Sequence, residues 1–308
     1  MNLAIGVDIG GTKIDFVLVN EQGEILFEHR LPTRPEEGSS AIHGRLREGI
    51  QTVLAQAPDQ VRGIGIGCPG HVDPVSGIVR TAVNLGWSAV PLKDMLQADL
   101  KLPIYLQNDV NAAALGEQVF GAAQGCADFV YLAVGTGLGG AAVVHGQIVN
   151  GTNAFAMEIG HLSLDLNGRL CKCGQRGCIE QYVSGVGLLA AVQEHGANYP
   201  DSVLRQHSDL ATSAILDAAR TGDPLALYVL EEAGQWLGRA FACCATFLNP
   251  PLMILGGGMG LAAAEWLLPP ALADFRQRVL SHISAPMRVE LSRVPRIAIG
   301  AAAQVFID

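Results

Sequence analysis

The chain has 308 residues, of which 49% are hydrophobic and 16% charged, and its net charge is −9. This length and apolar content predict two domains or a two-lobed fold with large buried cores. The acidic balance and the absence of any lysine or arginine run argue against a nucleic-acid surface, and no apolar run reaches membrane-spanning length uninterrupted. We therefore expect a soluble cytoplasmic protein that binds neither nucleic acid nor membrane.

The first motif is a glycine turn near the N-terminus. An apolar strand at residues 3–7 leads into the sequence DIGGTK at residues 8–13, and strand character returns at 14–19. Such a hairpin turn exposes backbone N–H groups that can hold phosphate, its threonine and lysine add a hydroxyl and a cation, and Asp8 could hold magnesium through water. No helix follows the glycines, so this is neither a P-loop nor a dinucleotide fingerprint, and taken alone it could be an ordinary turn.

The next part of the chain predicts a strand, a helix and a strand at residues 24–31, 39–55 and 61–67. The last strand ends in a turn that contains Gly70, at the carboxyl end where α/β sheets collect ligands. Asn84 follows in a polar loop. A loop asparagine is usually a turn former, so Asn84 alone predicts little.

A carboxylate follows the strand predicted at residues 104–107. Asn108 and Asp109 stand at the start of an alanine-rich helix that runs to about Val119. Asp109 could simply cap this helix. Its position at a strand end makes it equally a candidate to accept a proton from a bound hydroxyl. The residues leave both interpretations open.

A second glycine turn repeats the opening pattern. A strand at 129–134 runs into GTGLGG at 135–140, and a second strand follows at 141–144. Two such hairpins suggest duplicated halves that face a shared ligand. The remaining chain predicts helical regions at residues 183–195 and 210–248, the second with a break near 222–224. A strand at 252–255 then closes on the turn Gly256-Gly257-Gly258, and a short apolar helix follows at 300–306.

The densest chemical signal is a cysteine cluster. Cys171, Cys173 and Cys178 lie within eight residues, ten residues after His161, and this Cys₃His set is typical of a structural tetrahedral zinc site. A disulfide cluster is the alternative, but nothing at the N-terminus resembles a secretory signal, so we expect reduced thiols. The other four cysteines lie in apolar sequence and are expected to be buried thiols: Cys68, Cys126, Cys243 and Cys244.

Two carboxylates, Glu158 and Glu180, flank the zinc ligands. If His161 binds zinc through one ring nitrogen, its other nitrogen becomes an oriented N–H donor. One donor beside two carboxylate acceptors suits a polyhydroxylated ligand. Each glutamate alone could be an ordinary surface residue.

Together these motifs resemble the ROK family of sugar kinases, and among them the bacterial glucokinases. The resemblance covers essentially the whole chain, and the motifs occur jointly in the family's order. They are DIGGTK at 8–13, Pro69-Gly70, Asn84-Leu85, Asn108-Asp109, GTGLGG at 135–140, Glu158-x-Gly-His161, the C-x-C-G-x-x-G-C-x-E run that ends at Glu180, and Gly256-Gly257-Gly258. The resemblance implies an α/β, actin-like or hexokinase-type two-lobed ATPase fold with a central cleft between the lobes and a zinc-binding insertion. Its small lobe would be residues 1–118 plus about 288–308, and its large lobe 119–287.

Carried over residue by residue, the resemblance implies the functional residues. Asp109 would be the catalytic base for the sugar 6-hydroxyl. The sugar ligands would be Gly70, Asn84, Asn108, Asp109, Glu158, His161 and Glu180. ATP with Mg²⁺ would contact Asp8, Gly10, Gly11, Thr12, Lys13, Gly135, Thr136, Gly137, Gly139, Gly140, Gly256, Gly257 and Gly258. A structural Zn²⁺ would be bound by His161, Cys171, Cys173 and Cys178.

The expected activity is ATP-dependent phosphorylation of a hexose, glucose first, by a homodimer or homotetramer. Kinases of fructose, mannose, allose or N-acetylmannosamine stay open, as does a non-catalytic sugar sensor. Some relatives are sugar-responsive repressors with a DNA-binding segment ahead of this fold, for which the position of Asp8 near the start leaves no room. Met157 and Ala141 stand where the glucokinases usually have glycine. We expect Met157 to narrow the space near the sugar 2-position, and Ala141 only to stiffen a strand.

Overall fold

The computed structural model describes residues 2–206 and 210–307 and divides into two compact units. The first unit comprises Met1–Ala127, Ala141–Ala156 and Ser292–Asp308, and the second comprises Asp128–Gly140 and Met157–Leu291. The lobe boundaries expected from the sequence stay a prediction, and their outermost residues, Met1 and Asp308, lie outside the described residues. Within the described ranges, no helix combines the length and hydropathy needed to cross a membrane.

The first unit is built on a five-stranded sheet of order β3-β2-β1-β4-β8. Its strands are β1 (Leu3–Ile9), β2 (Lys13–Asn20), β3 (Ile25–Pro32), β4 (Val61–Cys68) and β8 (Ile104–Asn108). The first three form an antiparallel meander, while β1, β4 and β8 run parallel. Strands β1 and β4 are almost continuously apolar because helices cover both of their faces.

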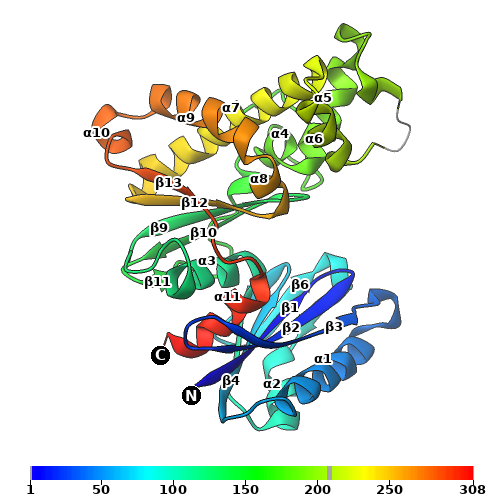
Figure 1. Cartoon of the computed structure of the whole chain (residues 1–308), viewed down its shortest axis with the longest axis vertical. Coiled ribbons are helices and arrows are strands. Elements are labelled where there is room, and N and C mark those ends of the chain that lie inside the picture. The colour runs from blue at the N-terminus through cyan, green and yellow to red at the C-terminus, as the bar shows by residue number, and fades with distance from the viewer. Residues whose placement is uncertain (1, 207–209, 308) are drawn as a thin grey trace. The chain divides into compact units, whose positions relative to one another are not determined.

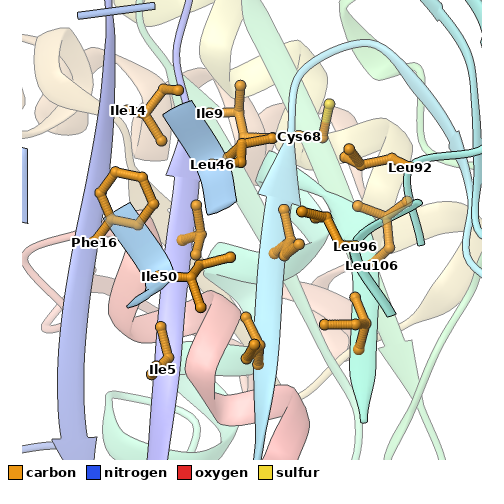
Figure 2. Packing of buried hydrophobic residues seen from close by; sticks show 14 of the residues in the cluster. Ile5, Ile9, Ile14, Phe16, Leu46, Ile50, Cys68, Leu92, Leu96 and Leu106 are labelled. Atoms are coloured by element: carbon orange, nitrogen blue, oxygen red, sulfur yellow. The ribbon is translucent and has the colours of Figure 1, made fainter. Parts of the chain in front are cut away.

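One face of this sheet packs against α1 (Ser39–Leu54) and α2 (Leu92–Leu100). Figure 2 shows the resulting core, in which Ile5 and Phe16 from the sheet meet Leu46 and Ile50 from α1. The helix places Ile42, Leu46, Ile50 and Val53 on one face because they recur every three or four residues.

The other face carries α11 (Ile297–Ala303), which packs on α3 (Asp109–Phe120) (Figure 1). A Cβ atom at Gly6 would lie 1.8 Å from the carbonyl oxygen of Ala298, so glycine is required for this close approach. Fully buried Glu117 on α3 ties in the C-terminal segment, because its Oε1 accepts hydrogen bonds from the Ser292 hydroxyl and from the amides of Arg293 and Val294.

The first unit also holds a small antiparallel sheet of order β5-β6-β7 and three 3₁₀ turns. The strands are β5 (His71–Asp73), β6 (Ile78–Ala82) and β7 (Trp87–Val90), and the turns are η1 (Pro35–Glu37), η2 (Val83–Leu85) and η6 (Gln304–Phe306). Strand β10 (Leu138–Val144) begins in the second unit and enters the first, where it pairs with β11 (Gln147–Ile148).

The second unit centres on the parallel strands β9 (Phe129–Val134), β12 (Leu252–Gly256) and β13 (Arg288–Leu291). The sheet order β11-β10-β9-β12-β13 repeats that of the first sheet, with a glycine turn between the strands of each leading hairpin. This repetition agrees with the duplicated halves expected from the sequence.

Helices make up most of the second unit. They are α4 (Glu180–Val183), α5 (Gly185–His195), α6 (Thr212–Arg220), α7 (Pro224–Leu248), α8 (Gly258–Ala262), α9 (Ala264–Arg278) and α10 (Ser281–Ser284), with 3₁₀ turns η3 (Ile159–His161), η4 (Gly196–Asn198) and η5 (Val203–Gln206). The long helix α7 starts at Pro224, where Asp223 accepts hydrogen bonds from the amides of Leu225 and Ala226. It packs along α9, with Phe241 and Phe275 edge to face.

Most strands and helices expected from the sequence are confirmed, with several corrections. Strand β10 starts at Leu138, so Gly139 and Gly140 belong to a strand and not to the turn. The helix expected at 183–195 is interrupted at Ser184, and the last helix starts at Ile297. Cys68 and Cys244 are buried as expected, whereas Cys126 and Cys243 are only half-buried. Among the described residues, ten strands and α-helices, most of them short, were not expected from the sequence: β5, β6, β7, β11, β13, α2, α4, α8, α9 and α10.

Candidate active site and metal centre

The parallel strands of the first unit bring two carboxylates to one sheet edge. Residue pairing sets Asp8 beside Gly67, and Cys68 beside Asn108, so β1, β4 and β8 end together. Asp109 follows at once as the first residue of α3. Both carboxylates therefore lie at the carboxyl ends of parallel strands, where α/β sheets collect ligands.

Asn108, not Asp109, caps helix α3. The side-chain oxygen of Asn108 accepts hydrogen bonds from the amides of Val110, at 2.9 Å, and Asn111, at 3.2 Å. Its side-chain nitrogen donates to the carbonyl oxygen of Gly70 at 3.0 Å, which ties the helix start to the loop after β4. The interpretation of Asp109 as a simple N-cap is therefore wrong: Asp109 is the first helical residue, and its carboxylate accepts a hydrogen bond from the Val110 amide at 2.9 Å.

The pKa of Asp8 at this edge is strongly perturbed. Burial, together with the negative charges of Asp109 and Asp15, raises its pKa to about 7, although Lys13 opposes the shift. Two carboxylates that repel each other in a poorly solvated position are relieved by a cation, and Mg²⁺ prefers oxygen ligands. The donor set therefore fits the Mg²⁺ role expected for Asp8.

The first glycine turn is held by Thr33, which the sequence analysis missed. Within the turn, the Gly10 amide donates to the Lys13 carbonyl oxygen at 2.9 Å. The fully buried Thr33 donates its hydroxyl to the Gly10 carbonyl at 2.6 Å and its amide to the Thr12 carbonyl at 3.0 Å. Nothing in the local sequence marks Thr33, because it comes from the end of β3, twenty residues beyond the turn.

Two other expected ligands lie close to this turn. The Lys13 ammonium is 2.9 Å from one carboxylate oxygen of Asp15, and Arg30 pairs with the other oxygen of the same carboxylate. Burial alone would raise the pKa of Asp15, but these hydrogen bonds hold it below its ordinary value. Asn84 is exposed and lies beside Gly11, since a Cβ atom there would be 3.6 Å from the Asn84 Cβ.

The metal centre expected from the sequence assembles in the second unit. One ligand atom each from His161, Cys171, Cys173 and Cys178 lies within 4.8 Å of the others. The His161 Nδ1 to Cys171 Sγ distance is 3.7 Å, and the Cys173 Sγ to Cys178 Sγ distance is 3.6 Å. A tetrahedron with zinc–sulfur bonds of about 2.3 Å has sulfur–sulfur edges of about 3.8 Å. These four residues therefore fit a zinc ion, with His161 bound through Nδ1.

The surroundings act differently on the thiols of the metal centre. The side-chain amide of Gln181 donates to Cys171 Sγ at 3.6 Å, and a hydrogen bond from the Gln175 amide lowers the pKa of Cys173 to about 7. Burial raises the pKa of the Cys178 thiol to about 12. The loop turns back at Gly177, where φ is +69° and a Cβ atom would lie 1.8 Å from the Asp165 carbonyl oxygen. A glycine at 177 is therefore needed to bring Cys178 to the other ligands.

The second glycine turn lies beside this centre. The Gly135 amide donates to the Gly137 carbonyl at 2.9 Å, and the Glu180 carboxylate accepts from the Leu138 amide at 3.0 Å. The turn at Gly256–Gly258 packs on the end of β9, the strand that leads into the second glycine turn, because a Cβ atom at Gly257 would lie 2.4 Å from the Val134 carbonyl oxygen. The structure thus brings both turns of the second unit to one sheet edge.

Glu158 and Met157 precede the 3₁₀ turn that carries His161. Glu158 is exposed, and Met157 has φ +64°, a left-handed conformation that a non-glycine residue adopts at a cost. The left-handed backbone at position 157 would by itself favour glycine there, whatever the sugar. Ala141 is buried within β10, as expected for a strand residue.

Comparison with known proteins agrees with this geometry. A model of the ROK family matches residues 4–304. A glucokinase of Halalkalibacterium halodurans is 34% identical over 288 residues, 91% of this chain and 87% of that protein. A crystal structure of a ROK family glucokinase from Streptomyces griseus, in complex with glucose and AMPPNP, has 33% identity and a TM-score of 0.81 over 98% of each chain.

A relative of another class also matches. A xylose repressor of Caldicellulosiruptor bescii is 30% identical over 312 residues, 99% of this chain and 78% of that protein. The fold is that of the sugar kinases, the actin-like or hexokinase type. The chain belongs to the ROK family.

Proposed function

We propose that the chain is an ATP-dependent glucokinase that phosphorylates the 6-hydroxyl of glucose. The observation that carries this proposal is the placement of Asp109 at a strand-end edge beside Asp8, which leaves helix capping to Asn108. The similarity over nearly the whole chain to proteins named glucokinase supports the same substrate.

In the proposed reaction the first unit supplies the base. The sugar 6-oxygen forms a bond to the γ-phosphorus of ATP, the bond from that phosphorus to the bridging oxygen breaks, and ADP leaves. Asp109 accepts the hydroxyl proton as the new bond forms. Asn108, Gly70 and Asn84 contribute sugar contacts. Asp8 would hold a Mg²⁺ ion, which when bound would neutralise phosphate charge.

The remaining assignments concern ATP and the other sugar ligands. We assign the ATP phosphates to the turns at residues 8–13 and 135–140, with adenosine near Gly256–Gly258. Glu158, His161 and Glu180 would hydrogen-bond sugar hydroxyls. A structural Zn²⁺ held by His161 and the three cysteines would keep the imidazole neutral and orient its Nε2–H as a donor. The active form would be a homodimer or homotetramer.

A sugar-responsive regulator is the second candidate, favoured by the match to the xylose repressor. Asp109 together with both glycine turns supports the kinase instead, because a protein that only senses sugar needs no turns for the phosphates of ATP. Among kinases, the alternatives are fructose, mannose, allose and N-acetylmannosamine as substrates.

The test is a pyruvate-kinase-coupled assay of the purified protein against a panel of hexoses, with Asp109→Asn alongside. Since Asn108 caps α3, the variant should keep the wild-type melting temperature. Turnover should fall by at least about 100-fold, the usual worth of a positioned base. No turnover of any hexose by the wild type, or near-normal turnover by Asp109→Asn, would count against the proposal.

A further inference from the structure

The second glycine turn is held in place by the segment that carries the metal ligands. Glu180 stands two residues after Cys178, and its Oε2 accepts the Leu138 amide at 3.0 Å. A Cβ atom at Gly137 would lie only 2.4 Å from the same carboxylate oxygen. The turn and this carboxylate are therefore fitted to each other, and any side chain at position 137 would break the contact.

The other end of the metal-bearing segment packs on the same strand. A Cβ atom at Gly160, next to His161, would lie 2.2 Å from the Leu138 carbonyl oxygen. One at Gly140 would lie 2.8 Å from Cγ2 of Ile159. Leu138 is thus contacted from two sides: Glu180 accepts its amide, and Gly160 packs against its carbonyl.

Backbone hydrogen bonds complete the support on the far side of Glu180. The Gly185 amide donates to the Gly135 carbonyl at 2.9 Å, and the Val186 amide donates to the Thr136 carbonyl at 3.4 Å. Ser184 begins helix α5 and donates its hydroxyl to the Glu180 carbonyl at 2.7 Å. These bonds leave the glycine turn joined to the metal-bearing segment along its length.

We propose that Glu180 is a positioning residue for the Gly135–Gly140 turn, so that the Cys₃His centre controls how well this turn receives the nucleotide phosphates. The proposal rests on the proposed function, which assigns phosphate binding to the turn. Glycines lose the most backbone freedom on ordering, so an unanchored turn would have to be ordered by the nucleotide itself. The other oxygen of the same carboxylate can serve a sugar hydroxyl, and the two roles separate by experiment.

The first experiment measures MgATP binding without hexose, by calorimetry, together with hydrogen exchange of residues 135–140. Glu180→Ala should weaken MgATP binding by at least about tenfold, since a hydrogen bond to a charged acceptor is lost, and should speed exchange of the Leu138 amide. Glu180→Gln retains an acceptor and should keep most of the MgATP affinity and most of the exchange protection at the Leu138 amide. Glu158→Ala is the matched control: it removes the other proposed sugar carboxylate and should leave both readouts at wild-type values.

The second experiment perturbs the metal centre. Cys173→Ser, checked for lost zinc by elemental analysis, should raise hydrogen exchange at residues 135–140 as Glu180→Ala does. Cys243→Ser, a half-buried thiol outside the metal cluster, should leave the turn protected. This readout does not depend on catalysis.

The outcomes separate this inference from the proposed function. Wild-type exchange at the turn in both Glu180→Ala and Cys173→Ser overturns the inference, even if sugar turnover is lost. Should Glu180→Ala not fold, the comparison of Cys173→Ser with Cys243→Ser decides, and equal protection of residues 135–140 in these two variants overturns the inference. Failure of the wild type to bind MgATP refutes the proposed function, and with it the nucleotide part of the inference, while the exchange result still shows whether Glu180 anchors the turn.

Discussion

Replacing the buried carboxylate at position 8 should change how stability depends on pH. The pKa of Asp8 is about 7 in the folded protein, against an ordinary value of 3.8, because of burial and the nearby charges of Asp109 and Asp15. A raised pKa means that the folded state holds a proton which the unfolded chain has released. The stabilisation from that proton is complete below about pH 4 and is lost as the pH rises through about 7.

The magnitude follows from these two pKa values. One pKa unit corresponds to about 1.4 kcal/mol, so Asp8 alone should remove up to about 4 kcal/mol of unfolding free energy from wild type between about pH 4 and pH 8. Asp8→Asn lacks this titration, so its unfolding free energy relative to that of the wild type should increase as the pH rises. Added Mg²⁺ should narrow the difference by stabilising the ionised carboxylate.

Urea unfolding in Mg²⁺-free buffer at a series of pH values measures the effect as a difference between the two proteins. Asp73→Asn is a suitable control, because Asp73 is not among the charges that shift the pKa of Asp8. Hydrogen bonds from Ser76 and Arg80 lower the pKa of Asp73 to about 2, so its own titration lies well under the range tested. If wild type and Asp8→Asn showed parallel stability curves between about pH 5 and pH 8, the reasoning about Asp8 would be refuted.

Three further predictions follow from the metal centre and the sugar-binding residues. Cys173→Ser should contain almost no zinc and lose about 2 kcal/mol or more of unfolding free energy, and full stability without metal would exclude a structural zinc. The kcat/KM for glucose should exceed that for 2-deoxyglucose at least about tenfold, because a missing hydroxyl leaves buried polar groups unpaired. N-acetylated hexosamines should be poor substrates, and an N-acetylhexosamine as the fastest substrate would contradict the choice of glucose. Met157→Gly should change stability by no more than about 1 kcal/mol, since relief of left-handed strain offsets the flexibility of glycine, whereas Met157→Ala keeps the strain; equal melting temperatures for these two variants would show that φ at 157 carries no strain.

The metal centre could be predicted from the sequence because its ligands are close along the chain. Cys171, Cys173 and Cys178 fit one tetrahedron with only one turn between them, and the sequence spacing already limits their distances. The apolar strands were predictable for a similar reason, since β1, β4 and β9 are short runs of buried residues followed by turn residues.

The contacts that make these motifs into a site could not be predicted in the same way. The Asn108–Asp109 pair offers two adjacent capping side chains, and only the backbone at the helix start decides that Asn108 caps and Asp109 is the first helical residue. Helix α9 was missed because Pro269 and Pro270 lie inside it, and proline inside a sequence normally argues against a helix.

The two glycine turns show most clearly where sequence reasoning stops. They share a pattern, a strand order and a proposed role, yet their supports differ. Thr33, a buried neutral residue directly after β3, donates its hydroxyl to the Gly10 carbonyl and its amide to the Thr12 carbonyl. Glu180, a charged side chain next to a metal ligand, binds the amide of Leu138. The first support depends only on the packing of its own sheet, whereas the second can depend on metal occupancy and on the sugar. If the halves arose by duplication, we expect metal binding to affect the second turn and not the first.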